Sequence, residues 1–243
     1  MSAYLAELLG TMILVFLGDG VVANVLLKQT KGNNGGWIVI TAGWGLAVAI
    51  AVYCTNAISG AHLNPAVTLG LASIGKFGWG LVPGYIAAQM AGGFLGGVLV
   101  YLTYLPHWPV TTSAGDKLGV FSTGPAIRHT VSNLICEALG TAMLMFGLLA
   151  ILSPANLLPN SGWDKGFAPA IVGMLVGAIG LSLGGPTGYA INPARDLGPR
   201  LAHFILPIPG KGGSDWGYSW IPVVGPIIGG IFGALVYKAL WAA

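Results

Sequence analysis

The stretch Gly-Ala-His-Leu-Asn-Pro-Ala at residues 60–66 recurs as Gly-Tyr-Ala-Ile-Asn-Pro-Ala at residues 188–194. Each copy ends in an Asn-Pro-Ala triplet, made by Asn64, Pro65 and Ala66 in the first and by Asn192, Pro193 and Ala194 in the second. Asn is a favoured helix N-cap and Pro a favoured first helical residue. Each triplet therefore predicts the start of a helix, and the two helices lie about half a chain apart.

The composition around these triplets is that of an integral membrane protein. Of the 243 residues, 55% are hydrophobic and only 7% are charged, whereas charged residues make up roughly a quarter of an ordinary soluble domain. Such a chain cannot build a soluble surface, so we expect it to contact a lipid bilayer. The formal charge of +3 is spread thinly, which excludes nucleic acid as a partner.

Six apolar stretches are long enough to cross a bilayer, which requires ~20 mostly apolar residues. Polar connectors rich in Gly, Asn and Pro separate them. The predicted spans are Tyr4 to Leu27, Trp37 to Ile58, Trp79 to Tyr101, Thr130 to Ser153, Phe167 to Leu183 and Trp220 to Trp241.

The two helices that begin at the triplets are too short to span. They run from Asn64 to about Ser73 and from Asn192 to about Phe204. A helix of ~11 residues rises only ~17 Å, about half of the ~30 Å hydrocarbon core. We therefore expect two re-entrant half-helices.

A second repeat indicates how the halves are related, because the stretch at residues 6–11 recurs at residues 136–141. The repeats cover approximately residues 1–104 and 130–243, joined by a connecting loop. Each holds three spans and one half-helix, and an odd number of spans inverts one repeat relative to the other. Inverted repeats bring their broken helices together at the midplane. Non-helical backbone at that depth is tolerated where it is buried in protein or lines a water-filled cavity, so we expect a pore or binding site.

The paired triplets and the repeated stretch at residues 6–11 resemble the aquaporin (major intrinsic protein) superfamily over essentially the whole chain. Asp196 after Arg195, together with Arg200, is more similar to its glycerol-facilitator branch. The resemblance implies an all-α membrane protein of six transmembrane helices plus two re-entrant half-helices, a single channel domain. It also implies an hourglass pore in each protomer of a homotetramer, in the plasma membrane, with cytoplasmic termini. The charges alone would place the termini outside, because Lys and Arg are more frequent in the opposite connectors.

The two half-helices would direct their positive dipole ends at the pore centre, each equivalent to roughly half a positive charge. Cations and hydronium would be repelled there. Asn64 and Asn192 can each turn an amide N–H toward a passing oxygen while the amide carbonyl is held by nearby backbone. Such an orientation would interrupt a proton-conducting chain of water.

Arg195 is unexpected, because a cation in the first turn of a helix opposes the dipole. The resemblance assigns it to the selectivity filter with Trp44, Gly180 and Tyr189. There Gly180 replaces the His of water-selective relatives and leaves a wider opening, while Trp44 and Tyr189 form an aromatic corner. Trp44 as an ordinary membrane-interface aromatic is the alternative, and Tyr189 departs from the Phe usual in glycerol facilitators.

Two acids lie within the predicted spans, and an intramembrane acid is a functional hypothesis by default. Glu7 and Glu137 would be relays in a proton-coupled transporter. Their equivalence in the two repeats favours bracing, in which they accept backbone N–H bonds from the re-entrant loops, and we expect His62 to support its loop. Asp19 and His203 lie near span ends or in connectors, so we expect them to be solvated or interfacial and without a chemical role.

Neither a nucleophile with its base nor a His/Asp/Glu metal set is evident, so we predict no enzyme, no cofactor and no metal site. The sequence predicts a passive channel for glycerol, other small uncharged solutes and water that excludes ions and protons. Two alternatives remain: a secondary transporter, which shares inverted repeats and broken helices, and a water-selective aquaporin.

Overall fold

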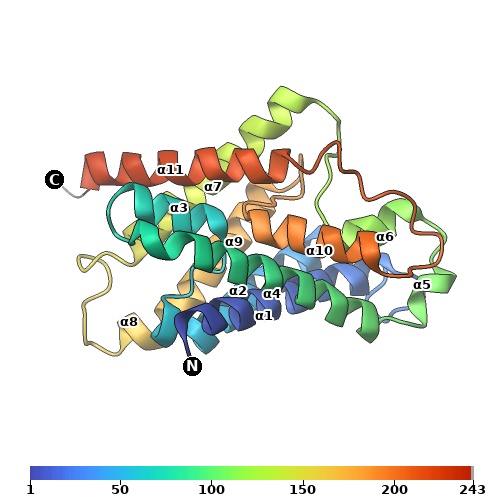
Figure 1. Cartoon of the computed structure of the whole chain (residues 1–243), viewed down its shortest axis with the longest axis horizontal. Helices are drawn as coiled ribbons and strands as arrows, with labels where there is room; N and C mark the ends of the chain where they lie inside the picture. Colours follow the sequence, from blue (N-terminus) through green and yellow to red (C-terminus); the bar gives the residue numbers. More distant parts are fainter. Residues whose placement is uncertain (242–243) are drawn as a thin grey trace.

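The computed structural model describes residues 1–241, and within them five long apolar helices could each cross a membrane. They are α1 (Ala3–Leu26), α2 (Trp37–Ser59), α4 (Val82–Thr103) with the 3-10 turn η1 (Trp79–Leu81) before it, α7 (Thr130–Ile151) and α11 (Ile221–Trp241). The helices run side by side along the long axis of the molecule (Figure 1). No strand occurs among the described residues. Residues 242–243, the end of the predicted second repeat, lie outside them.

The remaining predicted span is α9 (Ala168–Leu183), which has 16 residues. At ~1.5 Å per residue it rises about 24 Å, a little less than the ~30 Å hydrocarbon core. The short helix α8 (Trp163–Gly166) precedes it, and α9 packs against α2 and α7 among the long helices. With α9 the bundle has the expected six spans in the described part of the chain, and the start of α1 and the end of α11 lie toward one end (Figure 1).

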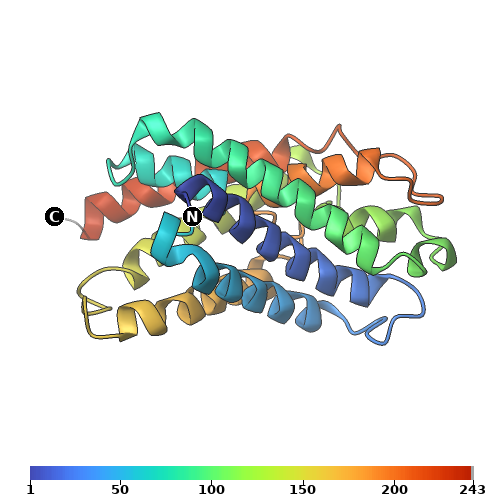
Figure 2. The same ribbon diagram turned by 60° about the horizontal axis from the view of Figure 1, so that its bottom comes forward.

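Two short helices begin at the Asn-Pro-Ala triplets, as predicted. They are α3 (Pro65–Ser73) and α10 (Pro193–Ile205), and both start inside the bundle (Figure 2). The side-chain oxygen of Asn64 accepts from the N–H of Ala66 at 2.8 Å, and that of Asn192 accepts from the N–H of Ala194 at 2.9 Å. Each Asn therefore caps its helix while Pro occupies the first turn.

The half-helices pack across the two halves of the chain: α3 lies against α11, and α10 lies against α4. Glycine permits both contacts. A Cβ atom added at Gly230 would lie 2.7 Å from the carbonyl oxygen of Ala66, and one added at Gly198 would lie 2.7 Å from the backbone nitrogen of Phe94. Small residues at such crossings let helix backbones approach closely, and here they lock each half-helix to the opposite half.

The connectors at the end opposite the start of α1 are partly helical. They contain α5 (His107–Val110) and α6 (Ala114–Phe121), and α6 packs against α1 and α10 (Figure 1). This connector therefore lies over the end of the bundle at which α10 is found.

Candidate functional site

The two Asn side chains each reach the other half of the chain. The amide nitrogen of Asn64 donates to the carbonyl oxygen of Ile191 at 2.8 Å, and that of Asn192 donates to the carbonyl oxygen of Leu63 at 2.8 Å. An amide carries two N–H donors, so each Asn keeps a second N–H for another acceptor. Both side chains line the central cavity of the bundle.

Glu7 holds the first re-entrant loop. One carboxylate oxygen accepts from the hydroxyl of Ser59 at 2.6 Å and from the N–H of His62 at 2.9 Å, and the other accepts from the N–H of Leu63 at 2.7 Å and the amide of Gln89 at 2.8 Å. Glu7 is completely buried. Four donors compensate the cost of burying this carboxyl group.

Glu137 makes the equivalent contacts in the second half. It accepts from the hydroxyl of Thr187 at 2.6 Å and from the N–H groups of Ala190 at 2.9 Å and Ile191 at 2.8 Å. The first span of each half thus ties down the loop that precedes its half-helix. This geometry fits the predicted bracing.

His62 lies beside these contacts. A ring nitrogen is 3.1 Å from the hydroxyl of Thr68, and the ring packs against Phe77 and Tyr85 at centroid distances of 4.6 and 5.0 Å. Aromatic neighbours and one polar partner hold the imidazole in place, which fits its expected supporting position.

The two loops have an unusual backbone. The φ angles of Ala61, Leu63, Tyr189 and Ile191 are +47°, +51°, +41° and +44°. The left-handed region costs an L-residue roughly 1–2 kcal/mol, so the glutamate contacts stabilise a strained path. Among the described residues no donor reaches the carbonyl oxygens of residues 61, 62, 189 and 190. These residues line the central cavity, and their free carbonyl oxygens are acceptors for whatever enters it.

Three cavities within the described residues share lining residues from one to the next. The central cavity shares Ala61 and His62 with the cavity near the ends of α2 and α7. It shares Trp44, Tyr189 and Arg195 with the cavity beside α6. Aliphatic side chains form the wall away from the two loops: Leu14, Val48, Val52, Leu144, Val172 and Val176. The cavities therefore mark a path through the bundle with one polar and one apolar wall.

The predicted selectivity filter is brought together where the central cavity meets the cavity beside α6. The guanidinium carbon of Arg195 lies 4.0 Å from the centre of the Trp44 ring, within the range of a cation–π contact. Trp44 is only 3% exposed, so its interpretation as a membrane-interface aromatic is wrong. The indole nitrogen of Trp44 and the hydroxyl of Tyr189 are buried without a hydrogen-bond partner in the described part of the chain.

Gly180 does not leave the open gap that we expected. A Cβ atom added there would lie 2.6 Å from Cζ and 2.9 Å from the hydroxyl oxygen of Tyr189, so the Tyr189 ring occupies this space. Trp37 donates its indole N–H to the Gly180 carbonyl at 3.0 Å and packs edge-on against the Tyr189 ring at 5.7 Å. Trp37 was not among the predicted site residues, because its sequence signal is only an aromatic residue at the start of a span.

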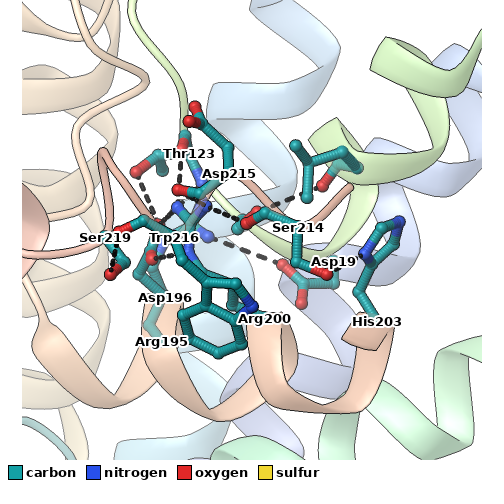
Figure 3. Close-up of polar contacts among 12 residues, drawn as sticks. Asp19, Thr123, Arg195, Asp196, Arg200, His203, Ser214, Asp215, Trp216 and Ser219 are labelled. Carbon is teal, nitrogen blue, oxygen red and sulfur yellow. Dashed lines mark hydrogen bonds and ion pairs between the residues drawn. The ribbon is translucent and has the colours of Figure 1, made fainter. Parts of the chain in front are cut away.

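Beyond the filter, a buried ion pair holds the connectors in place (Figure 3). Asp196 and Arg200 are both inaccessible to solvent, and the guanidinium donates to the two carboxylate oxygens at 2.8 and 3.0 Å. The same guanidinium donates to the carbonyl oxygens of Thr123 at 2.9 Å and Ser214 at 2.8 Å. The Arg200 side chain of α10 thus holds two connectors through hydrogen bonds.

The expectation that Asp19 and His203 are solvated or interfacial is wrong, since both are completely buried. His203 lies 2.9 Å from the Ser214 hydroxyl. Asp19 lies 3.6 Å from the guanidinium of Arg195. Their positions near helix ends suggested solvent, but α5, α6 and the connector before α11 cover that end of the bundle.

Lys211 caps the C-terminal end of α10. Its ammonium donates to the carbonyl oxygens of His203 and Leu206, at 2.6 Å each. A cation at a helix C-terminus is favourable because it meets the negative end of the dipole. Partial burial lowers the pKa of Lys211 from its ordinary value.

Comparisons with known proteins agree with this architecture. The family described as "Major intrinsic protein" matches residues 1–237. The chain is 64% identical over 241 residues to the "Probable glycerol uptake facilitator protein" of Thermotoga maritima, covering 99% of this chain and 100% of that protein. It is 56% identical over 239 residues to the "Glycerol uptake facilitator protein" of Bacillus subtilis, covering 98% and 85%.

A solved structure is also similar. The aquaglyceroporin from Plasmodium falciparum superposes with a TM-score of 0.83 at 32% sequence identity, covering 98% of this chain and 95% of that one. Both the sequence match and the fold extend over nearly the whole length. The chain belongs to the major intrinsic protein family.

Proposed function

We propose that this chain is a passive membrane channel for glycerol and other small uncharged solutes, and also for water. The observation that carries the proposal is the path of overlapping cavities that passes the paired Asn side chains, with free carbonyl oxygens on one wall and aliphatic side chains on the other. A polyol has hydroxyl groups along one side and C–H groups along the other, so it matches both walls. The glycerol uptake facilitators to which the chain is similar support this choice of solute.

At the filter, Arg195 supplies N–H donors for solute hydroxyls, and Trp44 with Tyr189 supplies an apolar corner for C–H groups. The buried Tyr189 hydroxyl and Trp44 indole nitrogen, which have no partner in the described residues, can also bond a passing hydroxyl. A neutral polyol can exchange its hydrogen bonds to water for hydrogen bonds to these groups. An ion loses far more hydration energy than its contacts with these groups supply.

At the centre, the N-termini of α3 and α10 place two partial positive charges beside the passage. The second N–H of Asn64 and of Asn192 donates to the oxygen of a passing water molecule, whose own hydrogens then point away from the two Asn side chains. Neighbouring waters cannot pass a proton through such an oxygen. The centre therefore excludes hydronium and other cations.

Further parts of the proposal concern the whole assembly. Residues 1–104 and 130–243 form inverted repeats of one channel domain, the protein assembles as a homotetramer in the plasma membrane, and its termini are cytoplasmic. The side chains of Glu7, Glu137 and His62 brace the loops and take no part in transport, and the chain is not an enzyme.

A water-selective channel is the second candidate, because the Tyr189 ring fills the space beside Gly180. Stopped-flow measurements of glycerol and water flux in proteoliposomes separate the two, with protein-free liposomes as the control. We expect flux of both solutes above the control and no uphill accumulation when a proton or sodium gradient is imposed. Water flux without glycerol flux would favour the second candidate, and gradient-driven accumulation would favour a transporter.

A further inference from the structure

Asp19 is a buried acid that the mechanism above does not use. It lies in α1 with no exposed surface, and neither carboxylate oxygen has a hydrogen-bond partner among the described residues. Its nearest charged group is Arg195, whose terminal nitrogen Nη1 lies 3.6 Å from Oδ1. Figure 3 shows the two side chains in one cluster.

Arg195 is likewise a buried charged residue with few polar contacts. Its side chain is 8% exposed, and a guanidinium stays charged in proteins. Its close contacts in the described residues are the face of Trp44, at 4.0 Å, and the carboxylate of Asp19. A buried charge without a partner is costly. Each of these two ions is therefore the other's available counter-charge.

The backbone of α1 organises both contacts. A Cβ atom added at Gly18 would lie 2.5 Å from Cη2 of Trp44, so this glycine lets the indole lie directly on α1. The adjacent residue, Asp19, reaches the guanidinium that stacks on the same indole. One turn of α1 thus positions both the Trp44 ring that stacks on Arg195 and the Asp19 carboxylate beside it.

We propose that ionised Asp19 is the counter-charge and positioning residue of Arg195, so that the filter offers guanidinium donors with almost no net fixed charge. The inference rests on the proposed channel function and deepens it. A guanidinium without a counter-charge binds carboxylates in a bidentate manner and would retain small anions in the passage. Paired with Asp19, it bonds neutral hydroxyl compounds and releases them.

A double-mutant cycle tests the pairing. Asp19→Asn keeps the shape and removes the charge, Arg195→Gln removes the other charge, and the double variant removes both. Coupled residues show non-additive effects. We expect Asp19→Asn to lower glycerol flux at least ~threefold in the wild-type background and less than ~1.5-fold in the Arg195→Gln background. Asp215→Asn, an acid-to-amide change on the same side of the bundle that does not contact Arg195, is the control and should retain wild-type flux.

Inhibition by formate provides a readout that a merely structural role would not change. Glycerol flux is measured in potassium formate and in potassium chloride at equal ionic strength. Asp19→Asn should be inhibited by formate, while the wild type, Asp215→Asn and the double variant should not. Additive effects in the cycle, or formate inhibition that is the same in wild type and Asp19→Asn, would overturn the proposal.

The pairing can also be tested if the single variants fold poorly, because folded yield and melting temperature in detergent can be compared across the same four proteins as a second double-mutant cycle. Each single variant leaves one buried charge unpaired, so the double variant should recover yield and melting temperature relative to both. Failure of the double variant to recover would also overturn the pairing. If the wild type itself passes no glycerol, the proposed function fails, while the melting cycle still decides whether Asp19 and Arg195 are paired.

Discussion

The side-chain amide of Asn64, in the first half of the chain, donates to the carbonyl oxygen of Ile191, in the second half, at 2.8 Å. The same amide caps its own half-helix through its oxygen. The bond between the halves and the orientation of the remaining N–H are therefore set together. A substitution that breaks this hydrogen bond must therefore disturb both the folding of the protein and the passage of solute.

Asn64→Asp tests this relationship, since Asp can still cap α3 but its carboxylate cannot donate to Ile191. We expect a loss of about 1–3 kcal/mol of stability, the cost of leaving a buried acceptor unpaired. The loss should be smaller at low pH, where a protonated acid regains a donor. Melting temperature in detergent measures it, with Asn34→Asp, at an exposed position, as the control. Equal melting temperatures for wild type and Asn64→Asp would contradict the expectation.

Glu7→Gln and Glu137→Gln should both reduce folded yield, and Glu7→Gln should do so more. Gln retains one acceptor oxygen and turns an NH₂ group toward N–H and O–H donors. Glu7 accepts four bonds and Glu137 three, and a bond to a charged group contributes about 1.5–3 kcal/mol. Size-exclusion yield and melting temperature provide the comparison. Glycerol flux should not respond to a proton gradient in the wild type or in either variant. A response in the wild type that a well-folded Glu→Gln variant had lost would identify a proton relay.

Gly180→His should decrease glycerol flux far more than water flux, because any Cβ atom at this position displaces the Tyr189 ring. Gly180→Ala should do the same to a smaller extent. Tyr189→Phe removes only the hydroxyl and should have the smallest effect. Gly185→Ala is the control, since an added Cβ there meets nothing within 4 Å. A proportional reduction of both fluxes in properly assembled Gly180→His would argue against a size filter at this point.

Arg200→Lys should loosen the connectors at residues 105–129 and 206–219. An ammonium cannot reproduce the guanidinium fork that meets Asp196, Thr123 and Ser214 together, and each buried acceptor left unpaired costs about 1–3 kcal/mol. Hydrogen exchange in both connectors should increase. Arg128→Lys is the matched control, because its pair with Asp215 is exposed and such pairs contribute about 0–1 kcal/mol. Unchanged exchange in Arg200→Lys would show that other contacts hold the connectors.

Much of the architecture could be predicted from local signals. The starts of α3 and α10 follow from an Asn cap and a Pro at the first helical position, which depend on neighbouring residues alone. The spans follow from long apolar runs. The shared superfamily pattern assigned Trp44, Tyr189 and Arg195 to one filter, and in the structure these three residues lie together.

What could not be predicted depends on contacts between distant segments. Gly180 suggested an opening because its own side chain is absent, but the neighbour that fills the space, Tyr189, comes from a loop. Asp19 is near the end of its helix in sequence, yet Arg195 from α10 and the covering connectors bury it. Trp37 was missed for the same reason, since its partner is a carbonyl oxygen 143 residues away.

The free acceptors of the two strained loops are main-chain atoms, and this has an evolutionary consequence. A point mutation exchanges a side chain but cannot remove a carbonyl oxygen. The row of acceptors at residues 61, 62, 189 and 190 therefore survives any substitution that leaves the path of the two loops unchanged. Side chains of the filter can accordingly be exchanged one at a time while the main-chain acceptors for hydroxyl groups stay in place.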